Sequence, residues 1–288
     1  PQTQPMSVGS AFDAKVKSEL ATALFGCPQP ELEYPSLFEA QVEEHNRDWA
    51  KGAGEHAFRA YKFSGMYEEL LGMLENSRET PEFESEVSKT ILGVPLKGFP
   101  DLRFIHECGV RVILDWKVKG FCSKTAASPT KGYRLCMDGQ SGKPSRSHEK
   151  AHKHYLGVDH NGLEVNKVYM EDCSTTYADQ LSLYGWLLGE KVGDEDVCLM
   201  IEELVWKNVG GEYPVGRVAN HRARVRKEHQ VALLARFKNC WKAVQSGHVF
   251  TDLPREENDQ QCLLMERTAR QMRMSGTEND AFIEATRA

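Results

Sequence analysis

Three charged residues, Asp101, Asp115 and Lys117, lie among valine, isoleucine and leucine in the stretch of the chain at 97–120. Asp115 comes fourteen positions after Asp101 and two positions before Lys117. In a β-strand, residues two apart point to the same side, so Asp115 and Lys117 share one face while Trp116 lies on the other. The pattern predicts a strand whose apolar face is buried and whose charged pair faces a cleft.

A turn within this stretch would bring the third charge close to the other two. The residues His106-Glu107-Cys108-Gly109 are typical of a hairpin turn between strands at 97–105 and 110–119. Together with a strand predicted at 83–92, these strands are expected to form a three-strand meander. If the hairpin closes there, Asp101 approaches Asp115. Converging carboxylates repel each other, and a hard divalent cation such as Mg²⁺ or Mn²⁺ allows both to stay ionised. Such a cation polarises a phosphodiester while a neighbouring lysine orients the attacking water, so the three residues suit metal-assisted phosphodiester hydrolysis.

These residues also resemble a family signature. The order Gly98-Phe99-Pro100-Asp101 and then Asp115-Trp116-Lys117 resembles the motif of the PD-(D/E)xK nuclease superfamily. Further along, Asp179-Gln180-Leu181-Ser182-Leu183-Tyr184 resembles the Gln-x3-Tyr motif of its RecB-like exonuclease branch. Gln180 and Tyr184 are four positions apart in a predicted helix, so they share a face.

The segment Gly9-Ser10-Ala11-Phe12-Asp13 resembles the Gly-x-x-hydrophobic-His motif on the first helix of the same branch. Asp13 stands where many members have a metal-binding histidine, and aspartate is itself a ligand for hard cations. The resemblance implies four metal ligands: Asp13, Asp101, Asp115 and the backbone carbonyl of Trp116. It also implies catalytic roles for Lys117, which activates water, and for Gln180 and Tyr184, which orient the substrate or the lysine.

The resemblance covers roughly residues 7–206 and implies a restriction-endonuclease-like α/β core. Such a core has a mixed central β-sheet flanked by helices, here with helical insertions. We expect a single nuclease domain over residues 1–288, with the motif-bearing parts at about 7–25 and 81–225. These parts include a helix predicted at 176–188 and a strand predicted at 197–206. The remaining segments are predicted as a helical insertion at about 36–77 without evident chemistry, a loop excursion at about 121–170 and C-terminal helices at about 227–273. We expect the helical insertion to be broken at Gly52 and Gly54 and again at Gly65.

Other charged residues have two interpretations each. Glu84 and Glu86 alternate along a predicted strand at 83–92, which favours a solvated face over a further carboxylate ligand. The histidines at 148, 152, 154 and 160 have spacing like that of zinc ligands, but an exposed basic loop is the better interpretation because nothing completes a zinc site. Candidate nucleic-acid-binding residues are Lys119, Arg217, Arg222 and Arg224, for which an ordinary charged face is the alternative.

Composition limits the class of protein. The net charge of −6 argues against broad electrostatic adhesion to nucleic acid, so a nucleic-acid enzyme would have to hold its positive charge locally. No apolar run is long enough to cross a bilayer, and the eight cysteines are too dispersed for a zinc or iron-sulfur motif. We therefore expect a cytoplasmic protein with free thiols, no iron-sulfur cluster and no membrane partner.

Taken together, the sequence predicts a Mg²⁺- or Mn²⁺-dependent nuclease, a DNA exonuclease of recombination, repair or phage DNA metabolism. Two alternatives stay open. One is a catalytically inactive nuclease fold that binds nucleic acid or a partner protein, and the other is a sequence- or structure-specific endonuclease. The sequence does not decide polarity, strand preference, DNA against RNA or oligomeric state.

Overall fold

The computed structural model describes residues 1–27, 29–119, 133–136, 158–160, 162–165, 168–207 and 215–248. The chain divides into two compact units. The larger unit consists of residues 2–89 and 97–230, and it contains every motif discussed above. The smaller unit contains the described residues 1, 90–96 and 231–248.

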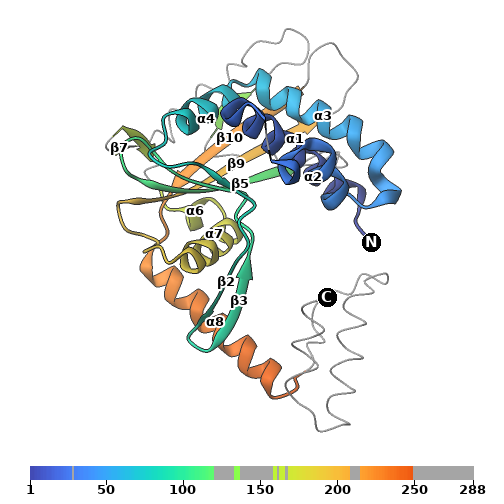
Figure 1. Cartoon of the computed structure of the whole chain (residues 1–288). Coiled ribbons are helices and arrows are strands. Elements are labelled where there is room, and N and C mark those ends of the chain that lie inside the picture. The colour runs from blue at the N-terminus through green and yellow to red at the C-terminus, as the bar shows by residue number, and fades with distance from the viewer. Residues whose placement is uncertain are drawn as a thin grey trace. The chain divides into compact units, whose positions relative to one another are not determined.

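A six-stranded mixed sheet forms the centre of the larger unit (Figure 1). Its order is β1 (Glu82–Phe83), β4 (Leu102–Ile105), β5 (Arg111–Lys119), β9 (Val197–Lys207), β10 (Val215–Ala223) and β6 (Tyr133–Cys136). Strands β5 and β9 are parallel, whereas the other neighbours are antiparallel. The predicted α/β class with a mixed central sheet and flanking helices is confirmed.

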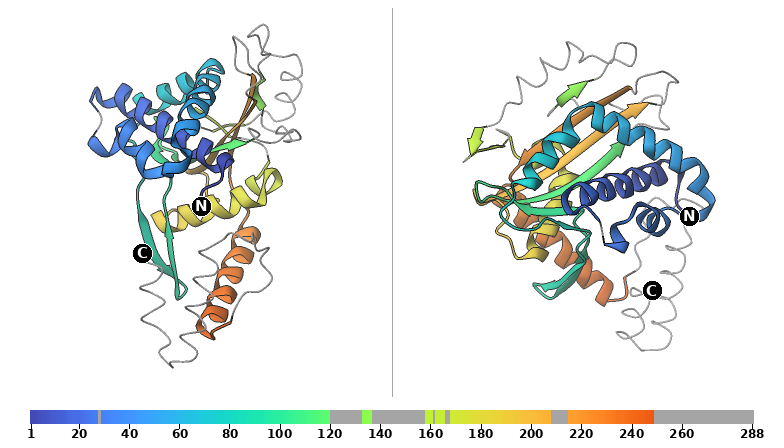
Figure 2. Two further views of the ribbon diagram at one scale, coloured as in Figure 1. Left: turned by 90° about the vertical axis from the view of Figure 1, so that its right-hand side faces the viewer. Right: turned by 45° about the horizontal axis from the view of Figure 1, so that its top comes forward.

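One face of the sheet is covered by helices α1 (Gln4–Phe25), α3 (Arg47–Phe63) and α4 (Met66–Glu75), as Figure 2 shows. The side chains of Val112, Leu114 and Trp116 point to this face and pack into the shared core. Helix α2 (Tyr34–Gln41) packs on α1, and short 3₁₀ turns at Pro30–Leu32 and Glu44–Asn46 flank it.

Helices α3 and α4, which lie in the segment predicted as helical at 36–77, contribute side chains to this core. The expected break of the helix at Gly52 and Gly54 is wrong, because α3 continues through both. A Cβ at Gly54 would lie 2.6 Å from the Cβ of Ala11, so the missing side chain lets α1 and α3 pack closely. The break at Gly65 is present, with a left-handed backbone (φ 80°) that only glycine adopts readily.

The opposite face packs against α6 (Met170–Cys173) and α7 (Thr175–Leu188). Ser174 begins α7 as its N-cap, since its side chain accepts a hydrogen bond from the backbone N–H of Tyr177. Ile113 on β5 points to this face, as do Leu199 and Ile201 on β9. Because β5 alternates its sides, Asp115 lies on the α7 face and Trp116 on the α1 face, as the strand pattern predicts.

The β4–β5 hairpin has the predicted turn, in which the backbone N–H of Gly109 donates to the carbonyl of His106 at 2.7 Å. The expected three-strand meander is wrong, however. The strand predicted at 83–92 is interrupted after β1, where Glu84 has a left-handed backbone (φ 52°). The chain then forms a separate hairpin of β2 (Val87–Ile91) and β3 (Val94–Gly98), and Pro100 separates β3 from β4.

The remaining described elements are the two-stranded sheet of β7 (Val158–His160) and β8 (Leu163–Val165), and helix α8 (Lys227–Gln245). Most of the excursion at 121–170 and the helix expected to end near 273 lie outside the described residues. None of the described helices combines the length and the hydrophobicity needed to cross a bilayer. The cysteines at 27, 108, 173, 198 and 240 are not paired in disulfide bonds.

Candidate metal and catalytic site

The register of the β4–β5 hairpin places Asp101 beside Asp115. Leu102 pairs with Leu114, so the residue before β4 lies next to residue 115 on the neighbouring strand. Asp101 Oδ2 accepts a hydrogen bond of 2.9 Å from the backbone N–H of Trp116, which fixes its carboxylate against β5. The two acids predicted from the sequence are thus brought together at the edge where β4 begins.

Asp115 is almost completely buried, with 2% of its surface exposed. Burial, followed by the charge of Asp101, raises the pKa of Asp115 to about 7, although the Lys117 ammonium opposes the shift. Lys117 forms an ion pair with Asp115 Oδ2, and its side chain is partly exposed. A buried carboxylate and a lysine that reaches the surface therefore stand side by side on β5.

Helix α7 supports Asp115 from the other direction. Gln180 Nε2 donates to Asp115 Oδ1 at 2.9 Å and to the hydroxyl of Tyr184 at 2.8 Å. Burial raises the pKa of Tyr184 to about 12, so its phenol is protonated at neutral pH. Gly98 packs against Tyr184 so closely that an added Cβ would lie 2.9 Å from the ring. The residues of both predicted motifs are consequently in one connected network.

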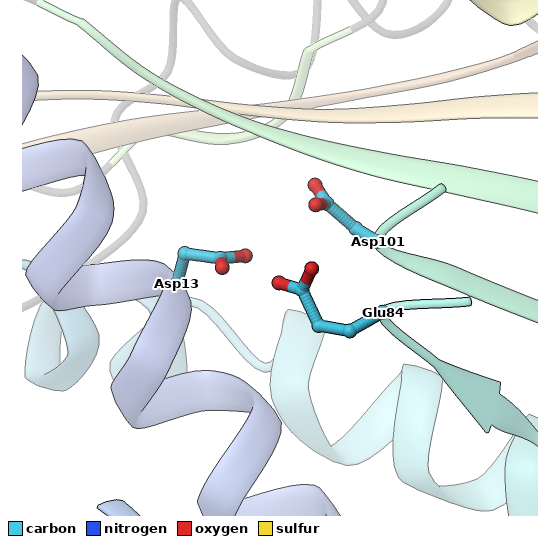
Figure 3. A group of neighbouring side chains, drawn as sticks. All are labelled: Asp13, Glu84 and Asp101. Atoms are coloured by element: carbon cyan, nitrogen blue, oxygen red, sulfur yellow. The ribbon is translucent and has the colours of Figure 1, made fainter. Parts of the chain in front are cut away.

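A second acidic group adjoins this network. The carboxylates of Asp13 on α1, Glu84 after β1 and Asp101 before β4 point toward one another in Figure 3, with one oxygen of each within 4.8 Å of the others. Three convergent carboxylates could hold a metal ion. The expectation that Glu84 belongs to a solvated face is wrong, because the left-handed backbone at Glu84 ends the strand alternation and directs its side chain to Asp13 and Asp101.

Lys17 was not predicted as a site residue, yet its ammonium lies among these three acids. Lys17 Nζ is 2.6 Å from Asp13 Oδ2 and 2.9 Å from Asp101 Oδ1, and it also contacts Glu84 Oε1. Burial opposes the charge of this 0%-exposed lysine, but the nearby acids outweigh that effect and raise its pKa. The i,i+4 spacing of Asp13 and Lys17 on α1 was the signal available in the sequence.

Asp13 has one carboxylate oxygen in contact with Lys17, whereas its Oδ1 is buried without a hydrogen-bond partner among the described residues. Burial raises the pKa of Asp13 to about 8, with Asp101 and Glu84 adding to the effect and Lys17 opposing it. A buried carboxylate oxygen without a partner is costly, and a cation would satisfy it. The set of ligand atoms therefore fits a hard metal ion.

The candidate nucleic-acid-binding side chains that the structure describes do not form one open basic surface. Lys119 is exposed, but its ammonium lies 3.1 Å from Glu203 Oε1 and 4.8 Å from the ring centre of Tyr177. Arg222 is buried and pairs with Glu69, so it faces the α4 side of the sheet rather than solvent. Arg224 is partly exposed and lies 3.9 Å from Glu195.

The side chain of Arg217 lies outside the described part of the chain, as do the side chains of the four histidines at 148, 152, 154 and 160. The backbone of residue 217 is in β10, and that of residue 160 is in β7. Their predicted roles stay predictions.

Comparison with known proteins adds little. No family model matches the chain, and no curated protein does. A solved structure described as the crystal structure of SSO0001 aligns over 82% of this chain and 74% of its own, with 11% sequence identity and a TM-score of 0.26.

Proposed function

We propose that this chain is a Mg²⁺- or Mn²⁺-dependent nuclease of the PD-(D/E)xK superfamily, with a restriction-endonuclease-like core closest in motif order to RecB-like exonucleases. DNA is the proposed substrate. The observation that carries the proposal is the convergence of Asp101, Asp115 and Lys117 on one hairpin, with Gln180 bound to Asp115. Four residues that the motifs relate only by spacing are thereby joined in one network.

The ligand atoms support the choice of metal. Asp13, Asp101 and Asp115 offer carboxylate oxygens, which suit Mg²⁺ and Mn²⁺ better than softer ions. The Trp116 carbonyl stays a predicted fourth ligand. When bound, the metal supplies Lewis-acid polarisation of the phosphodiester and lowers the pKa of a bound water.

The protein side chains then have separate tasks. Asp115 is held in place by Gln180, so its position does not depend on the metal alone. Lys117, whose side chain is partly exposed, orients the attacking water and stabilises negative charge that develops on the phosphate. Tyr184 acts as a neutral hydroxyl that fixes Gln180. Attack of water on phosphorus breaks the P–O3′ bond and leaves a 5′-phosphate and a 3′-hydroxyl, as the resemblance implies.

A second candidate is a nuclease fold that binds nucleic acid or a partner protein without cutting. The position of Lys17 favours it, because an ammonium already neutralises part of the acidic group. The position of Lys117 beside Asp115, where the nuclease motif has its lysine, supports the enzyme proposal instead.

A cleavage assay distinguishes these functions. End-labelled linear and circular DNA, single- and double-stranded, and RNA are incubated with the protein in Mg²⁺, Mn²⁺ or EDTA. We expect metal-dependent loss of linear DNA that is absent in Lys117→Ala. Cutting of circular substrates would identify an endonuclease, while binding without any cleavage in either metal would contradict the enzyme proposal.

A further inference from the structure

Lys17 is the least exposed charged group of the site. It extends from α1 into the space between Asp13, Glu84 and Asp101, and none of its surface reaches solvent. Its ammonium has three donor hydrogens and contacts one oxygen of each of these three residues. The hydrogen-bonding capacity of the lysine is therefore fully used.

The Lys17 ammonium also restricts where a metal can bind. A divalent cation between the same three carboxylates would lie within a few ångströms of this ammonium and be repelled by it. Because the side chain is enclosed, with its ammonium 5.8 Å from the ring centre of Trp116, no solvent lies beside it to receive the displaced charge. On the other side of Asp101, the cation that pairs with Asp115 is Lys117, whose side chain reaches the surface.

We propose that Lys17 is a resident cation that keeps divalent metal out of the space between Asp13, Glu84 and Asp101. The site then takes one metal, on the Asp115 side of Asp101. In this arrangement Lys17 and Glu84 are positioning residues for Asp101, and Asp13 keeps its Oδ1 for the metal. The inference rests on the proposed metal site but concerns the number of metals, which can be counted without any cleavage.

The test is the number of Mn²⁺ ions bound by the full chain, measured by equilibrium dialysis for wild type, Lys17→Met and Lys15→Met. Lys15 lies on the same helix, is partly exposed and pairs with Glu19 rather than with the three site acids, so it is a matched control. We expect Lys17→Met to bind one Mn²⁺ more than wild type and Lys15→Met to bind the same number. Equal binding by wild type and Lys17→Met would overturn the proposal.

Thermal unfolding provides a second readout. Without its lysine the acidic group is uncompensated, so Lys17→Met is expected to unfold at a lower temperature than wild type in EDTA. Mn²⁺ should restore most of the lost unfolding temperature, and it should raise the unfolding temperature of Lys17→Met more than that of wild type. If Mn²⁺ does not restore the unfolding temperature of Lys17→Met, the result would contradict the proposal that the Lys17 ammonium occupies a place where a metal ion could bind.

If Lys17→Met does not fold, Glu84→Gln decides the question. As a positioning residue, Glu84 can be replaced by glutamine with Mn²⁺ affinity staying within about a factor of three of wild type. A decrease of about tenfold or more would make Glu84 a ligand and overturn the proposal. The number of Mn²⁺ ions bound by wild type and by Lys17→Met can be measured even if the protein cuts no DNA. The nuclease proposal and the proposed role of Lys17 can therefore be contradicted independently.

Discussion

Two acidic groups lie on either side of Trp116, and they are satisfied in opposite ways. The backbone N–H of Trp116 donates to Asp101, while its indole Nε1 donates to Glu202 at 3.1 Å. Glu202 is 2% exposed and accepts two further hydrogen bonds, from Tyr61 and Asn220. The group around Asp101 instead combines the carboxylates of Asp13, Glu84 and Asp101 with the buried ammonium of Lys17. Asp13 Oδ1 has no hydrogen-bond partner among the described residues.

The difference separates a structural acid from a site. Glu202 is surrounded by neutral donors that satisfy it within the fold, so it joins α3 to β9 and has no need of a ligand. The acids around Asp101 repel one another and leave ligand capacity unused, an arrangement that stabilises a fold poorly but suits a cation. Burial of a carboxylate alone therefore does not mark the functional site; unmatched charge and unmet hydrogen bonds do.

The largest contrast is expected between Asp101→Asn and Glu202→Gln. Asp101→Asn removes a proposed metal ligand and should slow DNA cleavage about a thousandfold, equivalent to about 4 kcal/mol. Glu202→Gln keeps the shape of the structural acid and should change the rate little. Single-turnover rates in Mn²⁺ measure both. If Asp101→Asn and Glu202→Gln slow cleavage by similar factors, the distinction between a site acid and a structural acid would be wrong.

The next effect concerns stability. Glu202→Ala leaves buried donors on Tyr61, Trp116 and Asn220 without their acceptor and should lower the free energy of unfolding by about 3 kcal/mol. Urea denaturation measures the loss. Glu195→Ala is the control, because Glu195 is exposed and should change stability by less than about 0.5 kcal/mol. If Glu202→Ala lowers the free energy of unfolding by an equally small amount, the hydrogen bonds of Glu202 contribute little to stability.

A smaller effect should appear in the pH dependence of stability. Burial raises the pKa of Glu202 from 4.5 to about 7, so the folded state binds this proton more tightly than the unfolded state. The contribution of Glu202 is thus complete below pH 4.5 and is lost as the pH rises to about 7.

Glu202→Gln cannot titrate at this position. The unfolding free energy of wild type minus that of Glu202→Gln should therefore decrease over this interval by an amount on the order of 2 kcal/mol. Urea denaturation at several pH values measures it. A difference that is constant with pH would mean that folding does not raise the pKa of Glu202.

The smallest effect is expected at Gly98. In Gly98→Ala the new Cβ would lie 2.9 Å from the Tyr184 ring and 3.0 Å from Leu187, so the ring must move and disturb Gln180. Cleavage should fall about tenfold, or about 1.4 kcal/mol, with Mn²⁺ affinity unchanged. Gly72→Ala is the control, since nothing lies within 4 Å of a Cβ there. Unchanged cleavage in Gly98→Ala would argue against a role for the Tyr184–Gln180 contact.

Long elements with regular patterns were predictable from the sequence. The strands near 110–119 and 197–206, the helix near 176–188 and the turn at Gly109 have the expected bounds within a few residues. Local alternation also predicted that Asp115 and Trp116 face opposite sides of the sheet. Hairpin closure then brings Asp101 to Asp115, because register follows from the turn.

Contacts between distant segments were not predictable in this way. Glu84 lies in an alternating pattern that continues to Ser88, and nothing local signals its left-handed backbone. Lys17 looks like an ordinary helix lysine until α1 is packed against the β1–β4 edge. Tyr61 and Glu202 are separated by 141 positions, so their hydrogen bond exists only after the sheet and α3 have come together.

The most direct test of the account pairs Mn²⁺ binding with DNA cleavage in Asp115→Ala and Lys117→Ala. Calorimetric titration and cleavage of end-labelled linear DNA are measured on the same preparations, with circular dichroism as the check on folding. We predict that Asp115→Ala loses both Mn²⁺ binding and cleavage, whereas Lys117→Ala binds Mn²⁺ but does not cut. A folded wild-type protein that binds DNA and cuts nothing in Mg²⁺ or Mn²⁺ would contradict the central claim.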